Sequence, residues 1–528
     1  MSAALLTLKD LAVRLPAGAD RPYAMEGVSF SLAAGEIVCV VGESGSGKSM
    51  TANAIMRLLP PHVAIAAGEV LFEGRDLAHA SEADMRAVRS VDISMIFQEP
   101  MTALNPLHTV GDQIGEVFAV HTAMSKAAIR ARVLELIAEV RIPDPTHTAK
   151  AYPHELSGGQ RQRAMIAMAL ALGPKVLIAD EPTTALDVTT QAEILKLIRQ
   201  LQERKGTAVL FITHDFGVVA EIADRVVVME QGHVVEQGAA DAVLNHPQHP
   251  YTRALIAAVP PLAAPPPRQL STEPILTVEH LNKTYAKRGF FGRGGRTVRA
   301  LNDVSLTLPR GATVGVVGES GSGKSTLARC ILRLIDPDSG AALLDGKDLT
   351  RLSARDMRAE TKHIQMVFQD PYASLNPRRK AGELVAQGLI VHGTPRREAF
   401  AQARELMALV GLDPSAFNRH PHEFSGGQRQ RIGLARALAL RPKVLIADEP
   451  VSALDVSVQA QVLKLLADLR ERFGLSMLFV THDLRVAAQI CDWIAVMQNG
   501  VVVESGPTAQ VFNRPRHAYT RALLSAIP

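Results

Sequence analysis

The residues best suited to chemistry stand in one short segment that occurs twice, GESGSGKS at 42–49 and again at 318–325. Glycines let the backbone wrap closely around phosphate oxygens, and the N–H groups of such a loop and of the following helix attract the anion. Lys48 and Lys324 are expected to reach the terminal phosphates, and Ser49 and Ser325 to offer a hydroxyl to Mg²⁺. The pattern predicts two phosphate-binding loops, made of Gly42, Glu43, Ser44, Gly45, Ser46, Gly47, Lys48, Ser49, Gly318, Glu319, Ser320, Gly321, Ser322, Gly323, Lys324 and Ser325.

Two adjacent carboxylates end the apolar run VLIADE in each copy. Asp180 and Asp448 are placed to hold Mg²⁺, directly or through water. Glu181 and Glu449 follow them and are candidates to orient or deprotonate an attacking water. The alternative is a strand that ends in solvated acids, but the company of the phosphate loop favours a catalytic and metal-binding role.

A histidine follows another apolar run in the triplet THD, as His214 and as His482. A lone histidine at a strand end is usually structural or solvated. Here it recurs at the same distance from Glu181 and from Glu449, so we expect it to donate a hydrogen bond to a γ-phosphate.

The chain is a duplication. From Ser157 and Ser425 onward the offset between the copies is constant at 268, whereas it is 276 between Lys48 and Lys324. A period of this size indicates a duplicated domain and not a solenoid. The difference is a net insertion in the second copy, at KRGFFGRGGR (287–296). The proline-rich segment PPLAAPPPRQLSTEP predicts an extended connector, which gives domains at 1–259 and 275–528 joined by 260–274.

The elements that must position these residues alternate between strands and helices. Short apolar runs such as 36–41, 176–179 and 208–212 predict strands, and 192–204 predicts an amphipathic helix. Such alternation predicts an α/β fold with a mostly parallel sheet covered on both faces.

Composition narrows the class of protein. The net charge of +4 gives no general case for nucleic acid or an anionic membrane surface. Three distant cysteines provide neither a disulfide framework nor a cysteine-rich metal site, and a reducing compartment fits. We see no secretory signal and no apolar stretch near the roughly 18 residues of a membrane span, so other chains are expected to do any spanning.

The segment LSGGQRQR (156–163) recurs as FSGGQRQR (424–431). With the phosphate loop, the acid pair and the histidine, it resembles the signature of the ABC ATPase family, and the resemblance covers nearly the whole chain. Ser-Gly-Gly before a helix is physically another anion-binding N-terminus. The resemblance implies two tandem P-loop NTPase domains, each with a RecA-like core, a small antiparallel β subdomain and a helical signature subdomain.

The resemblance also implies composite sites for ATP and Mg²⁺, because in that family each nucleotide lies between the phosphate loop of one domain and the signature of the other. The loop at 42–49 would then face the second signature, and the loop at 318–325 the first. The implied signature residues are Ser157, Gly158, Gly159, Gln160, Ser425, Gly426, Gly427 and Gln428. Gln98 and Gln369 match the Q-loop glutamines, which contact Mg²⁺ and water, and Asp187 and Asp455 match the D-loop.

The family stacks adenine on an aromatic residue early in each domain. Tyr285 fits that position in the second half, whereas the first half has Leu15 there unless nearby Tyr23 substitutes. Losing the stack costs on the order of 1 kcal/mol, so we expect weaker adenine contact at the first site and two sites that are both catalytically competent.

The Q-loop continuations QEPMTALNP (98–106) and QDPYASLNP (369–377), with a Tyr-Thr-Arg-Ala-Leu tail in each half, resemble the dipeptide/oligopeptide/nickel importer ATPases. The fused arrangement is similar to single-chain ATPases of microcin C-type peptide importers. The resemblance implies two permease subunits, an extracytoplasmic solute-binding protein, and a peripheral place on the cytoplasmic face of a bacterial inner membrane.

Two other classes of tandem ATPase are alternatives for this sequence. A ribosome-acting translation factor would have a long charged helical linker where this chain has a short proline-rich one. A DNA-repair ATPase would have zinc-binding cysteines, which this chain lacks. The sequence leaves the transported solute open, because solute choice lies in other subunits.

Overall fold

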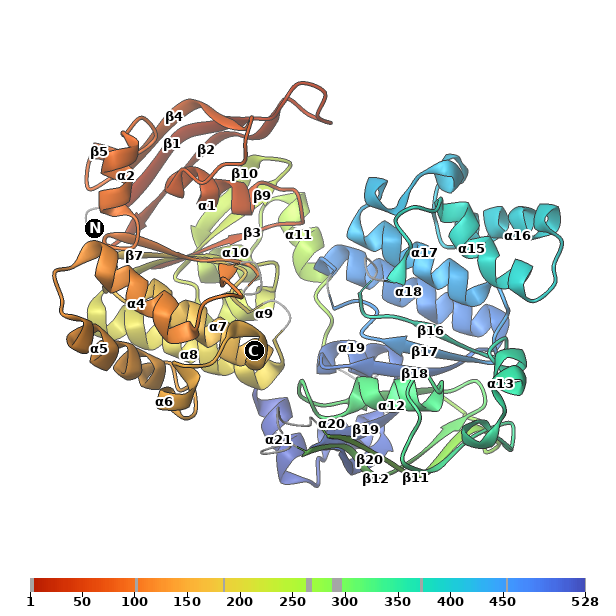
Figure 1. The fold of residues 1–528 in the computed structure, drawn as a ribbon. Helices are drawn as coiled ribbons and strands as arrows, with labels where there is room; N and C mark the ends of the chain where they lie inside the picture. The colour runs from red at the N-terminus through yellow and green to blue at the C-terminus, as the bar shows by residue number, and fades with distance from the viewer. Residues whose placement is uncertain are drawn as a thin grey trace. The chain divides into compact units, whose positions relative to one another are not determined.

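The structure is a computed structural model that describes residues 4–99, 103–183, 186–262, 268–286, 297–370, 374–452 and 454–527 (Figure 1). The insertion at 287–296, connector residues 263–267, Q-loop continuations 100–102 and 371–373, and Ala185 and Ala453 of the ALD triplets lie outside these ranges. The chain forms two compact units, one holding most residues up to Val259 and the other those from Pro260 to Ile527.

The core of the first unit is a six-stranded sheet in the order β10-β9-β3-β8-β7-β6. All neighbouring pairs are parallel except β10, which runs antiparallel on the edge beside β9. The predicted, mostly parallel sheet is therefore confirmed. Its strands are β3 (Ile37–Val41), β6 (Ile93–Ile96), β7 (Val176–Asp180), β8 (Ala208–Ile212), β9 (Arg225–Glu230) and β10 (His233–Ala239).

The five parallel strands are buried on both faces of the sheet, which is why they are continuous apolar runs, whereas the edge strand β10 is partly exposed. Along β3, Cys39 and Val41 pack into a cluster with helical side chains, whereas Val38 and Val40 pack into a second cluster with the antiparallel strands. Figure 1 shows α4, α5, α7 and α8 on one side of the sheet and β1, β2 and β4 on the other. The helices are α1 (Lys48–Met56), α2 (Glu82–Val88), α4 (Val110–His121), α5 (Lys126–Glu139), α6 (Pro145–Thr148), α7 (Gly158–Ala169), α8 (Val188–Lys205), α9 (Phe216–Ile222), α10 (Ala240–Asn245) and α11 (Pro250–Ala257), with the 3-10 turn η1 (Pro153–Glu155).

A small antiparallel sheet in the order β2-β1-β4-β5 covers α1. Its central strand β1 has an irregular register near Asp10, whose φ is 46°, and the equivalent strand β11 repeats this at His280, whose φ is 50°. The strands are β1 (Ala4–Arg14), β2 (Tyr23–Ala33), β4 (Ala64–Phe72) and β5 (Arg75–Asp76). The resemblance implied this subdomain, and it is present.

Helices α4 to α7 form the helical subdomain, and short polar side chains start them. Thr109, Ser125 and Ser157 each accept a hydrogen bond from a backbone N–H of the first turn of α4, α5 and α7. Such caps satisfy N–H groups that a helix cannot pair internally. The signature therefore begins a helix, as expected.

The second unit repeats this architecture, with core order β16-β17-β18-β13-β19-β20 and small-sheet order β12-β11-β14-β15. Its strands are β11 (Pro274–Ala286), β12 (Thr297–Pro309), β13 (Thr313–Val317), β14 (Ser339–Leu344), β15 (Lys347–Asp348), β16 (Ile364–Val367), β17 (Val444–Asp448), β18 (Ser476–Thr481), β19 (Trp493–Gln498) and β20 (Val501–Pro507). Its helices are α12 (Lys324–Ile331), α13 (Ala354–Glu360), α15 (Ala381–Val391), α16 (Arg396–Leu409), α17 (Gly426–Leu438), α18 (Val456–Phe473), α19 (Leu484–Ile490), α20 (Thr508–Asn513) and α21 (Ala518–Ser525), with η3 (Leu349–Arg351), η4 (Pro414–Asn418) and η5 (Pro421–Glu423). Among the described residues, no helix has the length and hydrophobicity that crossing a bilayer requires.

Candidate nucleotide-binding sites

The phosphate loop of each unit joins a buried core strand to a helix, β3 to α1 in the first and β13 to α12 in the second. Gly42 and Gly318 both have a φ of 152°, and a Cβ on either would lie 2.2 Å from a carbonyl oxygen, that of Met229 or Met497. Gly47 precedes α1 with a φ of 104°. Only glycine fits these positions, so the loop can lie close to the neighbouring strand and turn its N–H groups toward an anion.

The loop lysines are buried inside their own loops. Lys48 Nζ donates to Gly42 O at 2.7 Å and to Glu43 O at 2.9 Å. Lys324 Nζ makes the equivalent bonds in the second unit at 2.7 and 2.8 Å, and burial lowers its pKa. The carbonyls hold each ammonium in a place where it can meet a phosphate oxygen.

The loop serine contacts the first acid of the VLIADE run. Ser49 Oγ donates to Asp180 Oδ1 at 3.0 Å, and Ser325 Oγ donates to Asp448 Oδ1 at the same distance. Burial raises the pKa of Asp180 to about 6, against the lowering effect of the Ser49 bond, and burial also raises the pKa of Asp448. In each unit a half-buried serine hydroxyl and a buried aspartate carboxylate thus lie side by side, and they are the kind of oxygen ligands that Mg²⁺ prefers.

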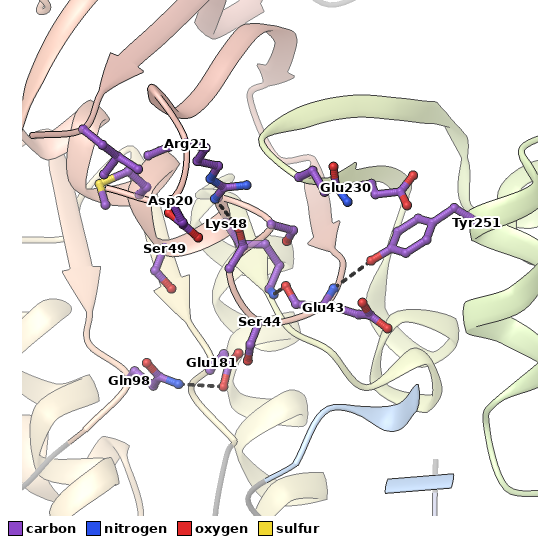
Figure 2. Close-up of a pocket in the computed structure, with 17 residues that line it drawn as sticks. Asp20, Arg21, Glu43, Ser44, Lys48, Ser49, Gln98, Glu181, Glu230 and Tyr251 are labelled. Atoms are coloured by element: carbon purple, nitrogen blue, oxygen red, sulfur yellow. Dashed lines mark hydrogen bonds between the residues drawn. The ribbon is translucent and has the colours of Figure 1, made fainter. Parts of the chain in front are cut away.

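The second acid is held between the Q-loop glutamine and the histidine. Gln98 Nε2 donates to Glu181 Oε2 at 2.9 Å (Figure 2), and His214 Nδ1 lies 3.3 Å from Glu181 Oε1. Three segments far apart in the sequence thus meet at one carboxylate, 8% exposed. The arrangement lets the glutamine and histidine orient a carboxylate that could accept a proton.

The second unit repeats this triad with nearly the same distances. Gln369 Nε2 donates to Glu449 Oε2 at 2.8 Å, and His482 Nδ1 lies 3.2 Å from Glu449 Oε1. Burial alone would raise the pKa of Glu449, but the hydrogen bond and charge of His482 and the charge of Lys324 hold it below its usual value. Burial would lower the pKa of His482, but the bond to Glu449 raises it. The two shifts favour an ion pair.

Both glutamates adopt a left-handed backbone conformation with a φ of 46°. Each is fixed there by its own N–H, which donates at 2.9 Å to Ile212 O for Glu181 and to Val480 O for Glu449. This conformation costs a non-glycine residue roughly 1–2 kcal/mol. The fold therefore keeps a strained residue at the same point of both units.

Local hydrogen bonds explain how THD presents its histidine. Thr213 Oγ1 accepts from the N–H of Asp215 at 3.0 Å, and Asp215 in turn caps α9 by accepting from the N–H of Gly217 at 2.8 Å. The same bond joins Thr481 and Asp483 at 3.0 Å. The two flanking residues build the turn, and the histidine between them projects to the glutamate.

The signature helix α7 opens with a reciprocal cap. Ser157 Oγ accepts from the N–H of Gln160 at 3.3 Å, and Gln160 Oε1 accepts from the N–H of Ser157 at 3.0 Å. A Cβ on Gly159 would lie 3.0 Å from Thr190 Cγ2, whereas one on Gly158 would meet nothing within 4 Å. The second glycine thus allows close packing on α8, and the first leaves the helix N-terminus open to a ligand.

The equivalent turn in the second unit has the same construction. Ser425 Oγ accepts from the N–H of Gln428 at 3.4 Å, and Gln428 Oε1 accepts from the N–H of Ser425 at 3.1 Å. A Cβ on Gly427 would lie 2.4 Å from Val458 Cγ1. Gly426 has more room, its Cβ meeting only Leu454 at 3.9 Å.

A cavity of about 670 Å³ surrounds the first phosphate loop (Figure 2). Leu15 lines it, whereas Tyr23 is not among the described lining residues and has the Arg14 guanidinium 5.8 Å from its ring centroid. Leu15 precedes Tyr285 by the same 270 positions that separate Asp10 from His280. The lining residues are Leu15, Asp20, Arg21, Ala24, Glu43, Ser44, Gly45, Ser46, Gly47, Lys48, Ser49, Met50, Gln98, Glu181, Glu230, Gln231 and Tyr251.

The sequence did not predict three residues that touch the phosphate loops. Arg21 donates from its guanidinium to Gly45 O. Tyr251 and Tyr519, from the C-terminal tail of each unit, each accept from a loop N–H at 3.0 Å. The only sequence signal for the tyrosines is their recurrence in the Tyr-Thr-Arg-Ala-Leu segment of both tails, and that segment by itself indicates the family and not a contact with the phosphate loop.

This fold and these contacts define a P-loop ATPase with two ATP-binding cassettes. The model of the ABC transporter family matches residues 25–184 and 301–452, more than half of the chain, and that of the oligopeptide/dipeptide transporter C-terminal region matches 235–289 and 503–528. The chain belongs to the ABC transporter family. The second match includes the tails that carry Tyr251 and Tyr519.

The relatives extend over nearly the whole chain. The peptidoglycan transport ATP-binding protein YejF of Agrobacterium fabrum is 50% identical to this chain, and the match extends over 99% of this chain and 96% of YejF. The glutathione import ATP-binding protein GsiA of Escherichia coli is 47% identical to this chain, and the match extends over 99% of this chain and 89% of GsiA. A solved dimeric ATP-binding cassette in a post-hydrolysis state with ADP and Pi is 31% identical, covering 44% of this chain with a TM-score of 0.41.

These findings confirm the expected class. The chain is an ATP-hydrolysing subunit of an ABC importer and not a ribosome-acting factor. The tandem ABC fold with two α/β units is likewise confirmed.

Proposed function

We propose that this protein powers the import of peptides or peptide-like solutes by hydrolysing ATP at two sites that share the same set of catalytic contacts. The observation that carries the proposal is the repetition of one complete set of contacts. Lysine to loop carbonyls, serine to aspartate, and glutamine and histidine to glutamate recur in both units within 0.1 Å. Because neither set lacks a member, two active sites are expected.

In this proposal the phosphate loops, with Lys48 and Lys324, bind the β- and γ-phosphates of ATP. Bound Mg²⁺ would neutralise charge developing on the phosphates. Its ligands in the chain would be the loop serine and the first acid, with the Q-loop glutamine nearby, namely Ser49, Asp180, Gln98, Ser325, Asp448 and Gln369. The contacts of Ser49 with Asp180 and of Ser325 with Asp448 support this set.

Glu181 and Glu449 act as general bases in this proposal. The glutamate accepts a proton from water as the water oxygen bonds to the γ-phosphorus, and the bond from that phosphorus to the β–γ bridging oxygen breaks, giving ADP and phosphate. Gln98 holds one carboxylate oxygen of Glu181 and His214 the other. The two neighbours thus orient the base, and the histidine is also expected to donate a hydrogen bond to the γ-phosphate.

Each ATP is also expected to need the signature turn of the other domain. Among the described residues that line the first cavity, none belongs to the signature turn of its own half. Yet that turn has the open helix N-terminus of an anion site. We infer that residues 1–259 and 275–528 are the two domains, joined by 260–274, and that ATP draws them together.

The proposed partners are two permease subunits and, through them, an extracytoplasmic solute-binding protein, which places this chain on the cytoplasmic face of an inner membrane. Relatives named for peptidoglycan and glutathione transport support a solute with peptide bonds. Movement of the domains would pass to the permease near Gln98 and Gln369. Co-purification of the tagged chain with membranes and two permease chains would support these partners, and co-purification with neither would refute them.

The hydrolysis proposal is tested by Glu181→Gln with Glu449→Gln. We expect turnover to fall about 10²–10⁴-fold, because a general base is removed. ATP binding should persist, since glutamine keeps the size and hydrogen-bonding reach of the side chain. The matched control is Glu221→Gln, an exposed glutamate of α9, which should hydrolyse normally. Wild-type turnover in the double variant would exclude both glutamates as bases.

A further inference from the structure

The tail of each unit brings a tyrosine onto the phosphate loop. Tyr251 is the second residue of α11, and its hydroxyl accepts from the backbone N–H of Glu43 at 3.0 Å (Figure 2). Tyr519 is the second residue of α21, and its hydroxyl accepts from the N–H of Glu319 at the same distance. The tyrosines lie 208 and 200 positions from their partners. Both units thus build the same long-range contact.

The contact falls on one particular peptide unit. The Gly42 carbonyl and the Glu43 N–H belong to the same peptide plane, and in a trans peptide they point in opposite directions. Lys48 Nζ donates to the carbonyl at 2.7 Å, while Tyr251 accepts from the N–H. The lysine and the tyrosine therefore hold one peptide plane from its two edges.

This plane follows a glycine in a conformation that other residues rarely adopt, a φ of 152° at both Gly42 and Gly318. Glycine has the widest range of backbone conformations, so little in the local chain fixes the plane's orientation. If the plane turned, the carbonyl would leave the lysine ammonium. The tyrosine hydroxyl is placed to oppose that rotation.

The tyrosine is itself firmly anchored. Glu236 of β10 accepts from the N–H groups of Gln248 and His249 at 2.7 and 3.1 Å, and His249 Nδ1 accepts from the N–H of Tyr251 at 3.3 Å. Thr252, the next residue, is fully buried. The turn before the tail helix therefore fixes where the phenol points.

The second unit has the same anchor. Glu504 accepts from the N–H groups of Arg516 and His517 at 2.8 and 3.0 Å, and His517 Nδ1 accepts from the N–H of Tyr519 at 3.2 Å. Burial raises the pKa of Tyr519 to about 12, so its phenol stays neutral near pH 7.

We propose that Tyr251 and Tyr519 are positioning residues for ATP binding, which orient the loop lysines through the Gly42–Glu43 and Gly318–Glu319 peptide planes. The C-terminal tail of each unit would thereby contribute to nucleotide binding. This inference rests on the proposed function in that it takes the loops to bind ATP phosphates.

The test isolates one site at a time in the full chain. In a Lys324→Ala background, which removes the second loop's lysine, Tyr251→Phe deletes one hydroxyl and keeps the ring. Binding of a fluorescent ATP analogue should weaken about 2- to 12-fold, the range for loss of one hydrogen bond. Tyr152→Phe, which alters a tyrosine 40% exposed, is the matched control and should bind as the background does. Tyr519→Phe in a Lys48→Ala background repeats the test at the other site.

A second measurement reports the bond itself. Hydrogen exchange of the Glu43 amide should accelerate in Tyr251→Phe, while exchange along α11 stays unchanged because packing is retained. In the otherwise wild-type chain, the KM for ATP should rise with little change in kcat, as expected for uniform binding. If Tyr251 had only a structural role, its substitution by phenylalanine would lower the unfolding temperature without raising KM selectively over kcat.

Two outcomes would overturn the inference. Unchanged affinity with unchanged exchange would show that the hydroxyl does not hold the loop. Faster exchange with unchanged affinity would show that the bond exists but does not position the lysine. Neither outcome would alter the loss of turnover expected for Glu181→Gln with Glu449→Gln, so failure here is distinct from failure of the proposed function.

Discussion

Replacing Asp180 by asparagine is expected to stabilise the nucleotide-free protein while weakening its response to Mg²⁺. Asp180 is 4% exposed, and burial raises its pKa from 3.8 to about 6. A carboxyl whose folded pKa is raised favours the folded state below its unfolded pKa, and this contribution is lost as pH rises through the folded pKa. The ionised carboxylate is therefore a source of instability above pH 6 when no cation is bound.

The size of the effect follows from the shift. A change from 3.8 to about 6 is about 2 pKa units, each equivalent to 1.36 kcal/mol, so asparagine should recover up to about 3 kcal/mol at pH 8. For a domain of roughly 250 residues this corresponds to a rise of about 6 °C or more in the first unit's unfolding temperature. Near pH 4 the gain should nearly vanish, because the wild-type carboxyl is then protonated.

Scanning calorimetry at pH 4 and pH 8 measures the prediction, with EDTA and then with ATP and Mg²⁺. The variant should unfold at a higher temperature than the wild type in EDTA at pH 8, and should gain less from Mg²⁺ with ATP because a carboxylate ligand is missing. Asp448→Asn is the matched variant in the second unit, where burial also raises the carboxyl's pKa. A variant no more stable than the wild type at pH 8 in EDTA would refute the reasoning.

Three other changes have expected outcomes. Lys48→Ala with Lys324→Ala should weaken nucleotide binding by about 10- to 100-fold, since charged hydrogen bonds are lost, and unchanged calorimetric affinity would contradict the phosphate-loop assignment. Leu15→Tyr should tighten ATP binding at the first site about fivefold and Tyr285→Leu should loosen it at the second, because each changes one aromatic stack; equal affinities in all variants would remove these positions from adenine binding. Gln160→Ala should speed hydrogen exchange at the start of α7 and lower turnover, since half of the reciprocal cap is lost, and unaltered exchange would show that the cap does not hold the turn.

Much of the candidate site could be predicted because its chemistry is local in sequence. The loop at 42–49 needs glycines, a lysine and a serine at fixed spacing, and the structure shows why at Gly42, where any Cβ would collide with Met229 O. The continuous apolar runs likewise identified strands buried on both faces, such as β3. In these cases the local structure admits only one type of residue, so the residue type predicts the structure.

Contacts that depend on the assembled fold could not be predicted in this way. Nothing near Tyr251 in the sequence indicates a partner 208 residues away, because a tyrosine in a helical tail is compatible with many environments. The left-handed backbone conformation of Glu181 could not be predicted from the sequence either. A positive φ is common only for glycine and, less so, for asparagine. A glutamate in the sequence therefore gives no indication of this conformation, which becomes understandable only from the hydrogen bond between Glu181 N–H and Ile212 O.

At the two left-handed glutamates, selection for a stable protein and selection for an active protein should favour different residues. If Glu181 or Glu449 were varied to every residue, glycine or asparagine should be enriched in a library sorted for cellular abundance, because the backbone conformation suits them. The same substitutions should be depleted when the library is sorted for growth on an imported nutrient. Disagreement between the two selections at these positions would mark residues retained for turnover at the expense of robustness, and would reveal them without any structure.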